Sequence, residues 1–308
     1  MACNLALVPS PVTWYEAHML AVRTPSHLDA DACAAFRSAG FLSVPDFADP
    51  GDVARLRSLF VRLFASPVGF TAGDRGDLIG DRGRVGTIPQ IVHLERYEPA
   101  LLDSPVRQRG FAIARDLLGG DVLLDCETAI LKVPGSPDST PWHQDEAFWS
   151  AETTHDAISI WIPLQDVDAD GGCMEFIAGS HRGEVRPHQA IRDVDDANGF
   201  ELVDVDPRYR TICPLPAGAA TVHHSRVAHS SGPNCTAIER YAYVMVFVGP
   251  RRPPPVKREF MWQGGRARDK RRVASRVGLD GLLNRVLRRA AIVVAKLNAW
   301  NDRRRYSG

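Results

Sequence analysis

Short β-rich runs dominate the second half of this 308-residue chain. Clusters of Gly, Pro and Asp separate these runs. The pattern favours an all-β sandwich or barrel over the alternating βαβ units of a parallel sheet. The sequence contains no GxGxxG or Walker motif, so nothing indicates a nucleotide-binding fold. The runs are residues 121–133, 157–164, 173–178, 218–229 and 240–249.

Helical patterns precede the β-rich region. An alanine-rich helix is predicted over residues 29–39, where aspartates cap its start and Gly40 ends it. A second, amphipathic helix opens at Asp49 and Pro50, and a third is predicted over residues 98–118. Helices followed by many strands indicate a mainly β core with helices packed on its outside.

Residues 66–93 form a segment rich in Gly, Asp and Arg, without a helical or a strand period. Loops of this length are usually functional lids or disordered segments. We therefore consider the segment, with Gln90 and His93 near its end, a candidate for substrate binding or a lid. Its alternation of Arg and Asp is equally typical of a solvated surface.

Charge divides the chain into two parts. Beyond Gly249 the sequence holds 17 Lys and Arg against 4 Asp and Glu, which leaves 20 basic and 33 acidic residues before that point. We predict a domain over residues 1–249 with N-terminal helical support, and a basic helical extension over residues 250–308. Hydrophobic content of 44% and charged content of 24% are ordinary for a globular protein.

The extension contains one apolar stripe at helical spacing, from Leu279 to Leu297, with Arg and Lys beside it. Such a helix could cap the domain, pair with a second subunit or lie on a membrane surface. A monomer and a homodimer therefore both stay open. No aromatic residues are interleaved with the basic ones, which argues against nucleic-acid binding.

Six scattered cysteines, without a CxxC pair, argue against a disulfide scaffold or a zinc–cysteine site. The N-terminal residues lack the basic start and apolar run of a signal peptide. No window approaches 18 consecutive apolar residues. We expect a cytoplasmic protein with reduced thiols.

The stretch PWHQDEAFW, residues 141–149, suggests a metal site. In a strand, residues two apart point to one face, so His143 and Asp145 can aim an imidazole and a carboxylate at one point. A third ligand is available in His229, at the end of a later β-run. Two histidines and one carboxylate leave three open positions on a metal, the arrangement of non-haem Fe(II) oxygenases.

A ferrous site of this kind needs electrons to activate O₂, and its usual co-substrate is 2-oxoglutarate. The remote 5-carboxylate of that molecule is best held by the two-pronged guanidinium of arginine. Arg240 lies eleven residues after His229, across a loop. If the two segments form a hairpin, Arg240 returns beside His229.

Other histidines compete for the third ligand position. His223 shares the face of His229, but lies roughly 20 Å away along an extended strand, so one iron could not use both. His224 points the other way. Neither is followed by arginine after eleven residues, since Asn234 and Cys235 occupy those positions. We therefore predict His229.

With these motifs in place, the chain resembles the phytanoyl-CoA dioxygenase (PhyH) family of Fe(II)/2-oxoglutarate-dependent oxygenases. The resemblance runs from AFRSAGFLSVPDFADPGDVARLRSLF to about Val248. Its anchors are WHQDEAFW, then ISIWIPLQDVDADGGCMEFIAGSHRGEV, then HHSRVAHSSGPN with the arginine beyond. The resemblance implies a jelly-roll core, a cupin-like double-stranded β-helix.

The resemblance also implies roles for individual residues. His143, Asp145 and His229 would bind iron, and Arg240 would clamp the 5-carboxylate of 2-oxoglutarate. Three further co-substrate contacts follow from matching positions: Ser231 as a second hydrogen-bond donor to that carboxylate, Trp161 as a pocket wall and Lys132 as another polar contact. Phe148 and Trp149 either line the mouth of the pocket or pack within the barrel.

The implied reaction converts 2-oxoglutarate and O₂ to succinate and CO₂ and hydroxylates an unactivated carbon of a small, free or carrier-bound biosynthetic substrate. The same chemistry can end in desaturation, epimerisation or cyclisation. Halogenation is disfavoured, because related halogenases replace this aspartate by a small residue and Asp145 is intact. Two readings from other classes are a catalytically silent jelly-roll binding protein and a zinc hydrolase, which would have no use for Arg240.

Overall fold

The computed structural model describes residues 27–70, 72–79, 87–154, 156–191 and 199–263. The predicted helix over residues 279–297 lies outside these ranges, so its packing, its membrane contact and its part in an oligomer stay predictions. Within the described residues, no helix is both long enough and apolar enough to cross a membrane.

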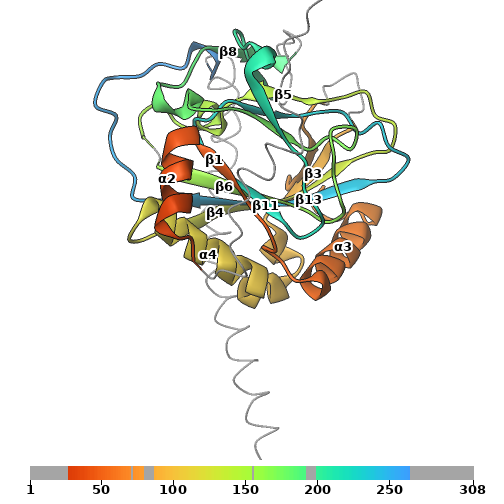
Figure 1. The fold of residues 1–308 in the computed structure, drawn as a ribbon. Coiled ribbons are helices and arrows are strands. Elements are labelled where there is room, and N and C mark those ends of the chain that lie inside the picture. Colours follow the sequence, from red (N-terminus) through yellow and green to blue (C-terminus); the bar gives the residue numbers. More distant parts are fainter. Residues whose placement is uncertain (1–26, 71, 80–86, 155, 192–198, 264–308) are drawn as a thin grey trace, which may run out of the picture. The chain divides into compact units, whose positions relative to one another are not determined.

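Two antiparallel sheets form the core of the described chain (Figure 1). The larger sheet has seven strands in the order β1-β11-β6-β13-β4-β3-β2, and the smaller has four in the order β10-β7-β12-β5. Strands distant in sequence are neighbours in both sheets, as the predicted jelly-roll requires. The strands of the larger sheet are β1 (Phe41–Val44), β11 (Ala220–His224), β6 (Ala157–Pro163), β13 (Arg240–Val248), β4 (Leu123–Lys132), β3 (Pro89–Val92) and β2 (Arg75–Asp77).

In the smaller sheet, the strand that ends with His143 lies beside the strand that begins with His229, because β12 pairs with both β5 and β7. A separate two-stranded sheet pairs β8 with β9. The strands are β5 (Thr140–His143), β7 (Met174–Ile177), β10 (Arg210–Cys213), β12 (His229–Ser231), β8 (His188–Ala190) and β9 (Phe200–Leu202).

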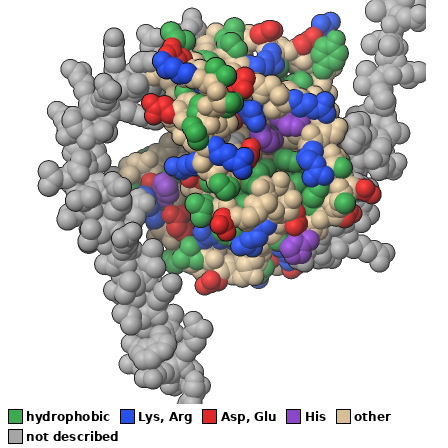
Figure 2. Space-filling view, turned by 90° about the vertical axis from the view of Figure 1, so that its left-hand side faces the viewer, with side chains coloured by type: hydrophobic (Ala, Val, Ile, Leu, Met, Phe, Trp, Pro, Cys, Tyr) green, Lys and Arg blue, Asp and Glu red, His purple; other side chains and the backbone are tan. Residues whose placement is uncertain are grey.

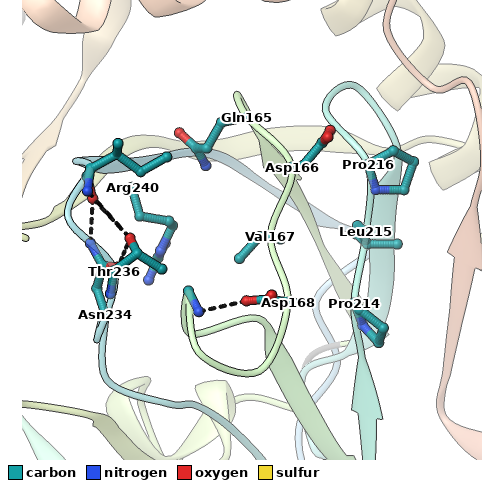
Figure 3. A pocket seen from close by; sticks show the side chains of 12 residues that line it. Gln165, Asp166, Val167, Asp168, Pro214, Leu215, Pro216, Asn234, Thr236 and Arg240 are labelled. Atoms are coloured by element: carbon teal, nitrogen blue, oxygen red, sulfur yellow. Dashed lines mark hydrogen bonds between the residues drawn. The ribbon is translucent and has the colours of Figure 1, made fainter.

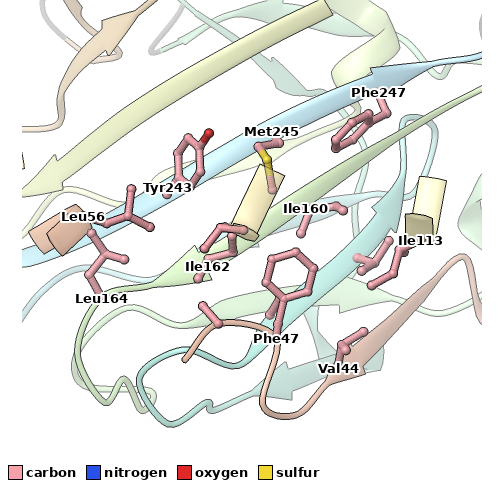
Figure 4. Packing of buried hydrophobic residues seen from close by; sticks show 14 of the residues in the cluster. Val44, Phe47, Leu56, Ile113, Ile160, Ile162, Leu164, Tyr243, Met245 and Phe247 are labelled. Atoms are coloured by element: carbon pink, nitrogen blue, oxygen red, sulfur yellow. The ribbon is translucent and has the colours of Figure 1, made fainter. Parts of the chain in front are cut away.

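Among the described residues, three α-helices precede or interrupt the strands, and α3 and α4 lie against the larger sheet (Figure 1). Alternation along β6 explains how this sheet serves two purposes. Ile158, Ile160 and Ile162 point into the apolar core beneath the helices, whereas Ser159 and Trp161 face the cavity between the sheets. Figure 4 shows part of this core. The helices are α2 (Ala30–Ala39), α3 (Pro50–Ala65) and α4 (Pro105–Leu118).

The helix boundaries follow local chemistry. The Asp29 side chain accepts a hydrogen bond from the Ala32 amide at 2.8 Å, and Gly40 adopts the left-handed backbone that ends α2. The helix predicted over residues 98–118 is instead a 3₁₀ turn, Pro99–Asp103, followed by α4. Pro105 accounts for the break, because a proline disfavours helical backbone in the residue before it.

The β-rich run predicted over residues 218–229 also divides. It forms β11 in the larger sheet and the start of β12 in the smaller one, with a turn at residues 225–227 between them. A single extended strand was therefore the wrong expectation, and the turn brings both ends of this run to the same cavity.

Figure 2 shows one face of the molecule. Among the described residues on that face, Lys and Arg side chains are interspersed with Asp and Glu.

A segment beyond β13 returns to the loop that follows β5. Arg258 donates to the Glu146 carboxylate at 2.7 Å and to the Thr153 carbonyl at 2.7 Å, and the Trp262 indole donates to the Ala147 carbonyl at 3.0 Å. The Glu146 side chain is fully buried. Part of the predicted extension thus packs on the residues next to Asp145.

We predict that Arg258→Ala lowers the free energy of unfolding by about 3 kcal/mol, because it leaves a buried carboxylate with one weaker partner. That remaining partner is Arg226, whose Nε lies 3.4 Å from Glu146. Denaturant unfolding measures the change. Arg251→Ala is the matched control: its ion pair with Asp125 is solvent-exposed and should contribute less than about 1 kcal/mol. Equal effects of both substitutions would contradict the prediction.

Candidate metal centre

Three candidate ligands converge between the sheets. His143 ends β5 and pairs in register with His229, the first residue of β12. Asp145 begins the 3₁₀ helix Asp145–Phe148 after an extended Gln144, so the strand alternation persists across the triplet. The Asp145 Oδ1 atom lies 3.6 Å from Nε2 of His143 and 3.4 Å from Nε2 of His229. Within the described ranges, this is the one group of three such residues whose ligand atoms lie within 4.8 Å of one another.

Hydrogen bonds orient both imidazoles for metal binding. Nδ1 of His143 lies 2.8 Å from the Pro141 carbonyl oxygen, and Nδ1 of His229 lies 2.9 Å from the Val227 carbonyl oxygen. A carbonyl only accepts, so each Nδ1 carries the proton and each Nε2 presents its lone pair to the site. Backbone carbonyls commonly orient metal-binding histidines in this way. The donor set of two nitrogens and one carboxylate oxygen therefore fits Fe(II).

The charge states also suit a cation. Burial acts to raise the pKa of Asp145, but the neighbouring His229 charge and the close approach of the His143, His223 and His229 imidazoles outweigh it and hold that pKa well below its usual value. Burial, together with the His229 charge, lowers the pKa of His143. The carboxylate is thus ionised and the imidazole neutral near neutral pH, which are the forms that coordinate metals.

A buried cation lies at the same cavity. Arg240 begins β13, is 3% exposed and places its guanidinium carbon 5.4 Å from the centre of the Trp161 ring. Its Nη2 donates to Ser231 Oγ at 3.3 Å, while Nε and Nη1 have no hydrogen-bond partner among the described residues. Burial lowers its pKa to about 10. Buried unpaired donors are costly, so this group fits a carboxylate such as that of 2-oxoglutarate.

Lys132 contacts Ser231, the hydrogen-bond partner of Arg240. It is fully buried, and its Nζ donates to the Ser231 carbonyl at 2.8 Å, to Ser231 Oγ at 3.1 Å and to the Gly232 carbonyl. It is absent from the residues that line the cavity. Burial and the Arg240 charge lower its pKa well below its usual value. Any effect of Lys132 on the co-substrate would thus pass through Ser231, which also donates to the Gly172 carbonyl at 2.8 Å.

The cavity that joins these groups has a volume of about 360 Å³, within the range of small-molecule sites. Phe148, Trp149 and Gln90 line it, and the Phe148 ring lies 5.8 Å from that of His143. A second cavity of about 490 Å³ also includes Arg240 in its wall (Figure 3). Residues of the first cavity to which the sequence assigned no role include Leu78, Asp125, Cys126, Thr128, Ser159, Met174 and His223.

His93 does not reach the cavity. It follows β3 with a left-handed backbone, φ 56°, and its Nδ1 lies 3.7 Å from the Glu95 carboxylate. Gln90 and His93 are three residues apart, so strand alternation alone would place them on opposite faces.

His223 is the residue that the sequence misplaced. Its ring centre lies 4.4 Å from that of His229, not roughly 20 Å along one strand. The turn at residues 225–227 folds β12 back across the cavity from β11. That turn has the sequence Ser-Arg-Val, in which Ser is only a weak turn residue and the stronger ones, Gly, Pro, Asn and Asp, are absent.

Hydrogen bonds also hold Gln144, the residue between the ligands His143 and Asp145. His188 is buried, with Nδ1 2.7 Å from the Arg186 carbonyl, so its Nε2 accepts a hydrogen bond from the Gln144 amide at 3.2 Å. The Gln144 side chain donates to the Arg226 carbonyl at 2.5 Å and accepts from the Arg186 amide at 2.7 Å. These bonds fix the residue that spaces His143 from Asp145.

Acid should destabilise the folded chain through two buried histidines. Burial lowers the pKa of His188 to about 4, and burial followed by the Arg226 charge lowers that of His224 to about 3. The unfolded chain, with histidine pKa values near about 6.5, binds more protons below that pH. Stability should fall from pH 6.5 towards pH 4, by on the order of 2 kcal/mol for each group. Denaturant midpoints at pH 7.5 and 4.5 measure this change. If the midpoint of His224→Gln falls between these pH values by as much as that of the unsubstituted protein, His224 does not contribute as predicted.

Comparisons with known proteins agree with this geometry. Residues 36–242 match the family model described as Phytanoyl-CoA dioxygenase (PhyH). EvdO2 from Micromonospora carbonacea var. aurantiaca, solved in complex with 2-oxoglutarate, is 37% identical with a TM-score of 0.69; the match covers 76% of this chain and 96% of that one.

Two curated relatives match over shorter regions. A probable alpha-ketoglutarate-dependent hypophosphite dioxygenase of Stutzerimonas stutzeri is 31% identical over 145 residues, 45% of this chain and 50% of that protein. L-proline trans-4-hydroxylase of Streptomyces griseoviridis is 29% identical over 154 residues, 44% of this chain and 58% of that protein. The chain thus spans about half the length of these relatives. The family match, the jelly-roll and the His143–Asp145–His229 group together show that this chain belongs to the PhyH family of Fe(II)/2-oxoglutarate-dependent dioxygenases.

Proposed function

We propose that this enzyme hydroxylates an unactivated carbon of a small biosynthetic intermediate, free or carrier-bound, while 2-oxoglutarate is converted to succinate and CO₂. One observation carries the proposal: the cavity of about 360 Å³ holds both a metal-binding tripod and a buried arginine with unpaired donors. A protein that only binds a ligand gains nothing from the tripod, and a zinc hydrolase gains nothing from the arginine.

Each side chain has a defined task in this proposal. Two imidazole Nε2 atoms and Asp145 Oδ1 would hold Fe(II), which when bound supplies the O₂-dependent oxidation. The free Nε and Nη1 of Arg240 would donate to the 5-carboxylate of 2-oxoglutarate, and Ser231 would turn its hydroxyl from the Gly172 carbonyl to the same carboxylate. The Trp161 ring would form the wall beside the guanidinium, and Lys132 would hold Ser231 in place from behind through its hydrogen bonds.

The other residues that line the cavity indicate what kind of substrate it accepts. Phe148 and Trp149 offer apolar surface next to the metal ligands, and Gln90, Asp125 and Thr128 offer hydrogen-bonding groups from β3 and β4. A substrate with a flat or aliphatic portion and several polar substituents suits this combination. The relative named as a proline hydroxylase supports hydroxylation as the outcome.

Anaerobic loading with Fe(II) and 2-oxoglutarate, followed by O₂ and a panel of candidate substrates, tests the proposal. Succinate should form in step with a product that has gained one oxygen atom, as mass spectrometry detects. A product that has lost two hydrogens, or an isomer, would instead assign desaturation or epimerisation, and cyclisation would also give a product without the added oxygen. The absence of succinate with every candidate would favour a silent binding protein.

A further inference from the structure

The second oxygen of the Asp145 carboxylate has its own partners. Whereas Oδ1 faces the Nε2 atoms of His143 and His229, Oδ2 accepts a hydrogen bond from Ser159 Oγ at 2.6 Å. Nε2 of His223 lies 3.5 Å from the same Oδ2 atom. The two oxygens of one carboxylate therefore face different sets of side chains.

Ser159 and His223 are held as a pair. They are opposite each other in the register of β6 and β11, so their side chains share one face of the larger sheet. Each is 2% exposed. The His223 ring also packs against Phe176, with ring centres 5.3 Å apart, and its Nδ1 has no hydrogen-bond partner among the described residues. The His223 ring thus packs against Phe176 and faces the Asp145 carboxylate, where its Nε2 atom approaches Oδ2.

Coordination arithmetic gives this pairing a purpose. Three protein donors leave three of six positions on Fe(II), two for chelating 2-oxoglutarate and one for O₂. If Asp145 bound through both oxygens, the protein would fill four positions, and 2-oxoglutarate would fill the rest. A carboxylate whose Oδ2 is already engaged cannot chelate without losing those contacts.

We propose that Ser159 and His223 are positioning residues that keep Asp145 a one-oxygen ligand and so preserve the third open position. The inference rests on the proposed role of His143, Asp145 and His229 as the metal centre. The metal ligands come from the smaller sheet and its following turn, whereas this pair comes from the larger sheet. The larger sheet thereby sets the orientation of a ligand that it does not carry.

Ser159→Ala and His223→Phe remove the two contacts while keeping side-chain bulk close to the original. Each variant should bind Co(II) and Fe(II) about tenfold more weakly or worse, as is typical when an outer partner of a metal ligand is lost. The visible charge-transfer band of the anaerobic Fe(II)–2-oxoglutarate complex should shift in both. His223→Gln retains a donor at similar reach and should recover most of the affinity.

Thr221→Val is the matched control. Thr221 lies on β11 two residues before His223, is fully buried, and its hydroxyl has no partner among the described residues. Its substitution should leave the affinity and the band unchanged. Thermal unfolding establishes that every variant is folded.

The outcomes separate two failures. If the unsubstituted protein binds metal in a way that His143→Ala abolishes, but Ser159→Ala and His223→Phe match Thr221→Val in affinity and band, the positioning role is overturned and the metal centre stands. If the unsubstituted protein binds no Co(II) or Fe(II), both the metal centre and the positioning role are overturned.

Discussion

Replacing His229 with alanine should abolish succinate formation and weaken Fe(II) binding by more than about 100-fold, beyond the effect usual for an outer partner of a ligand. The physical reason is the loss of one of three donors, which leaves His143 and Asp145 as a two-point site. His229 is 3% exposed, and its imidazole is already oriented by the Val227 carbonyl. Competition titration against a metal-sensitive dye measures the affinity.

His27→Ala is the control for this experiment. The His27 side chain is exposed and pairs with Asp116 near the start of α2, so its removal should change neither metal affinity nor succinate yield. Retention of tight Fe(II) binding by the His229 variant would show that another residue supplies the third donor. His223, with its ring 4.4 Å from that of His229, is the nearest alternative, and the double substitution would identify it.

Arg240→Ala should raise the KM for 2-oxoglutarate by about 100-fold or more, with little change in Fe(II) affinity. Hydrogen bonds between a guanidinium and a carboxylate contribute about 1.5–3 kcal/mol each, and every 1.4 kcal/mol corresponds to about tenfold in binding. Arg240→Lys should recover only part of the loss, because an ammonium offers a point charge without the planar fork. Initial rates of succinate formation at varied 2-oxoglutarate provide the measurement.

Arg62→Ala serves as the comparison, since the Arg62 side chain is 64% exposed and its nearest acidic partner, Glu98, lies 3.7 Å away. An unchanged KM in the Arg240 variant would remove the main reason to distinguish this site from a hydrolytic zinc site. A change in substrate KM alone would instead move Arg240 from the co-substrate to the substrate.

The parts of the site that could be predicted from the sequence were those set by residues close together in the chain. The spacing of His143 and Asp145 predicts a shared face because backbone alternation has a period of two, and the structure places their ligand atoms together with that of His229. The jelly-roll followed from the ordered motifs of a known family. Arg240 was predicted from its spacing after His229, but the expected hairpin was wrong, because β12 belongs to the smaller sheet and β13 to the larger one. Its Nη2 nevertheless donates to Ser231 at 3.3 Å.

Contacts set by tertiary packing were beyond the sequence. The Arg258–Glu146 ion pair joins residues 112 positions apart, and Arg258 belongs to no motif that could have pointed to Glu146. His223 was misplaced because the Ser-Arg-Val turn carries only a weak local signal. His93 was a candidate for substrate binding from its place at the end of the 66–93 segment, and its left-handed backbone, a property of one residue in its fold context, cannot be read from spacing.

The division of labour between the two sheets has a consequence for how the enzyme is assembled. The iron ligands belong to the four-stranded layer and its following turn, while Arg240, Ser159 and His223 belong to the seven-stranded layer. Neither layer alone offers a complete site. Metal and co-substrate, once bound, would link the two sheets. The reaction therefore requires a chain in which both sheets have formed and packed against each other.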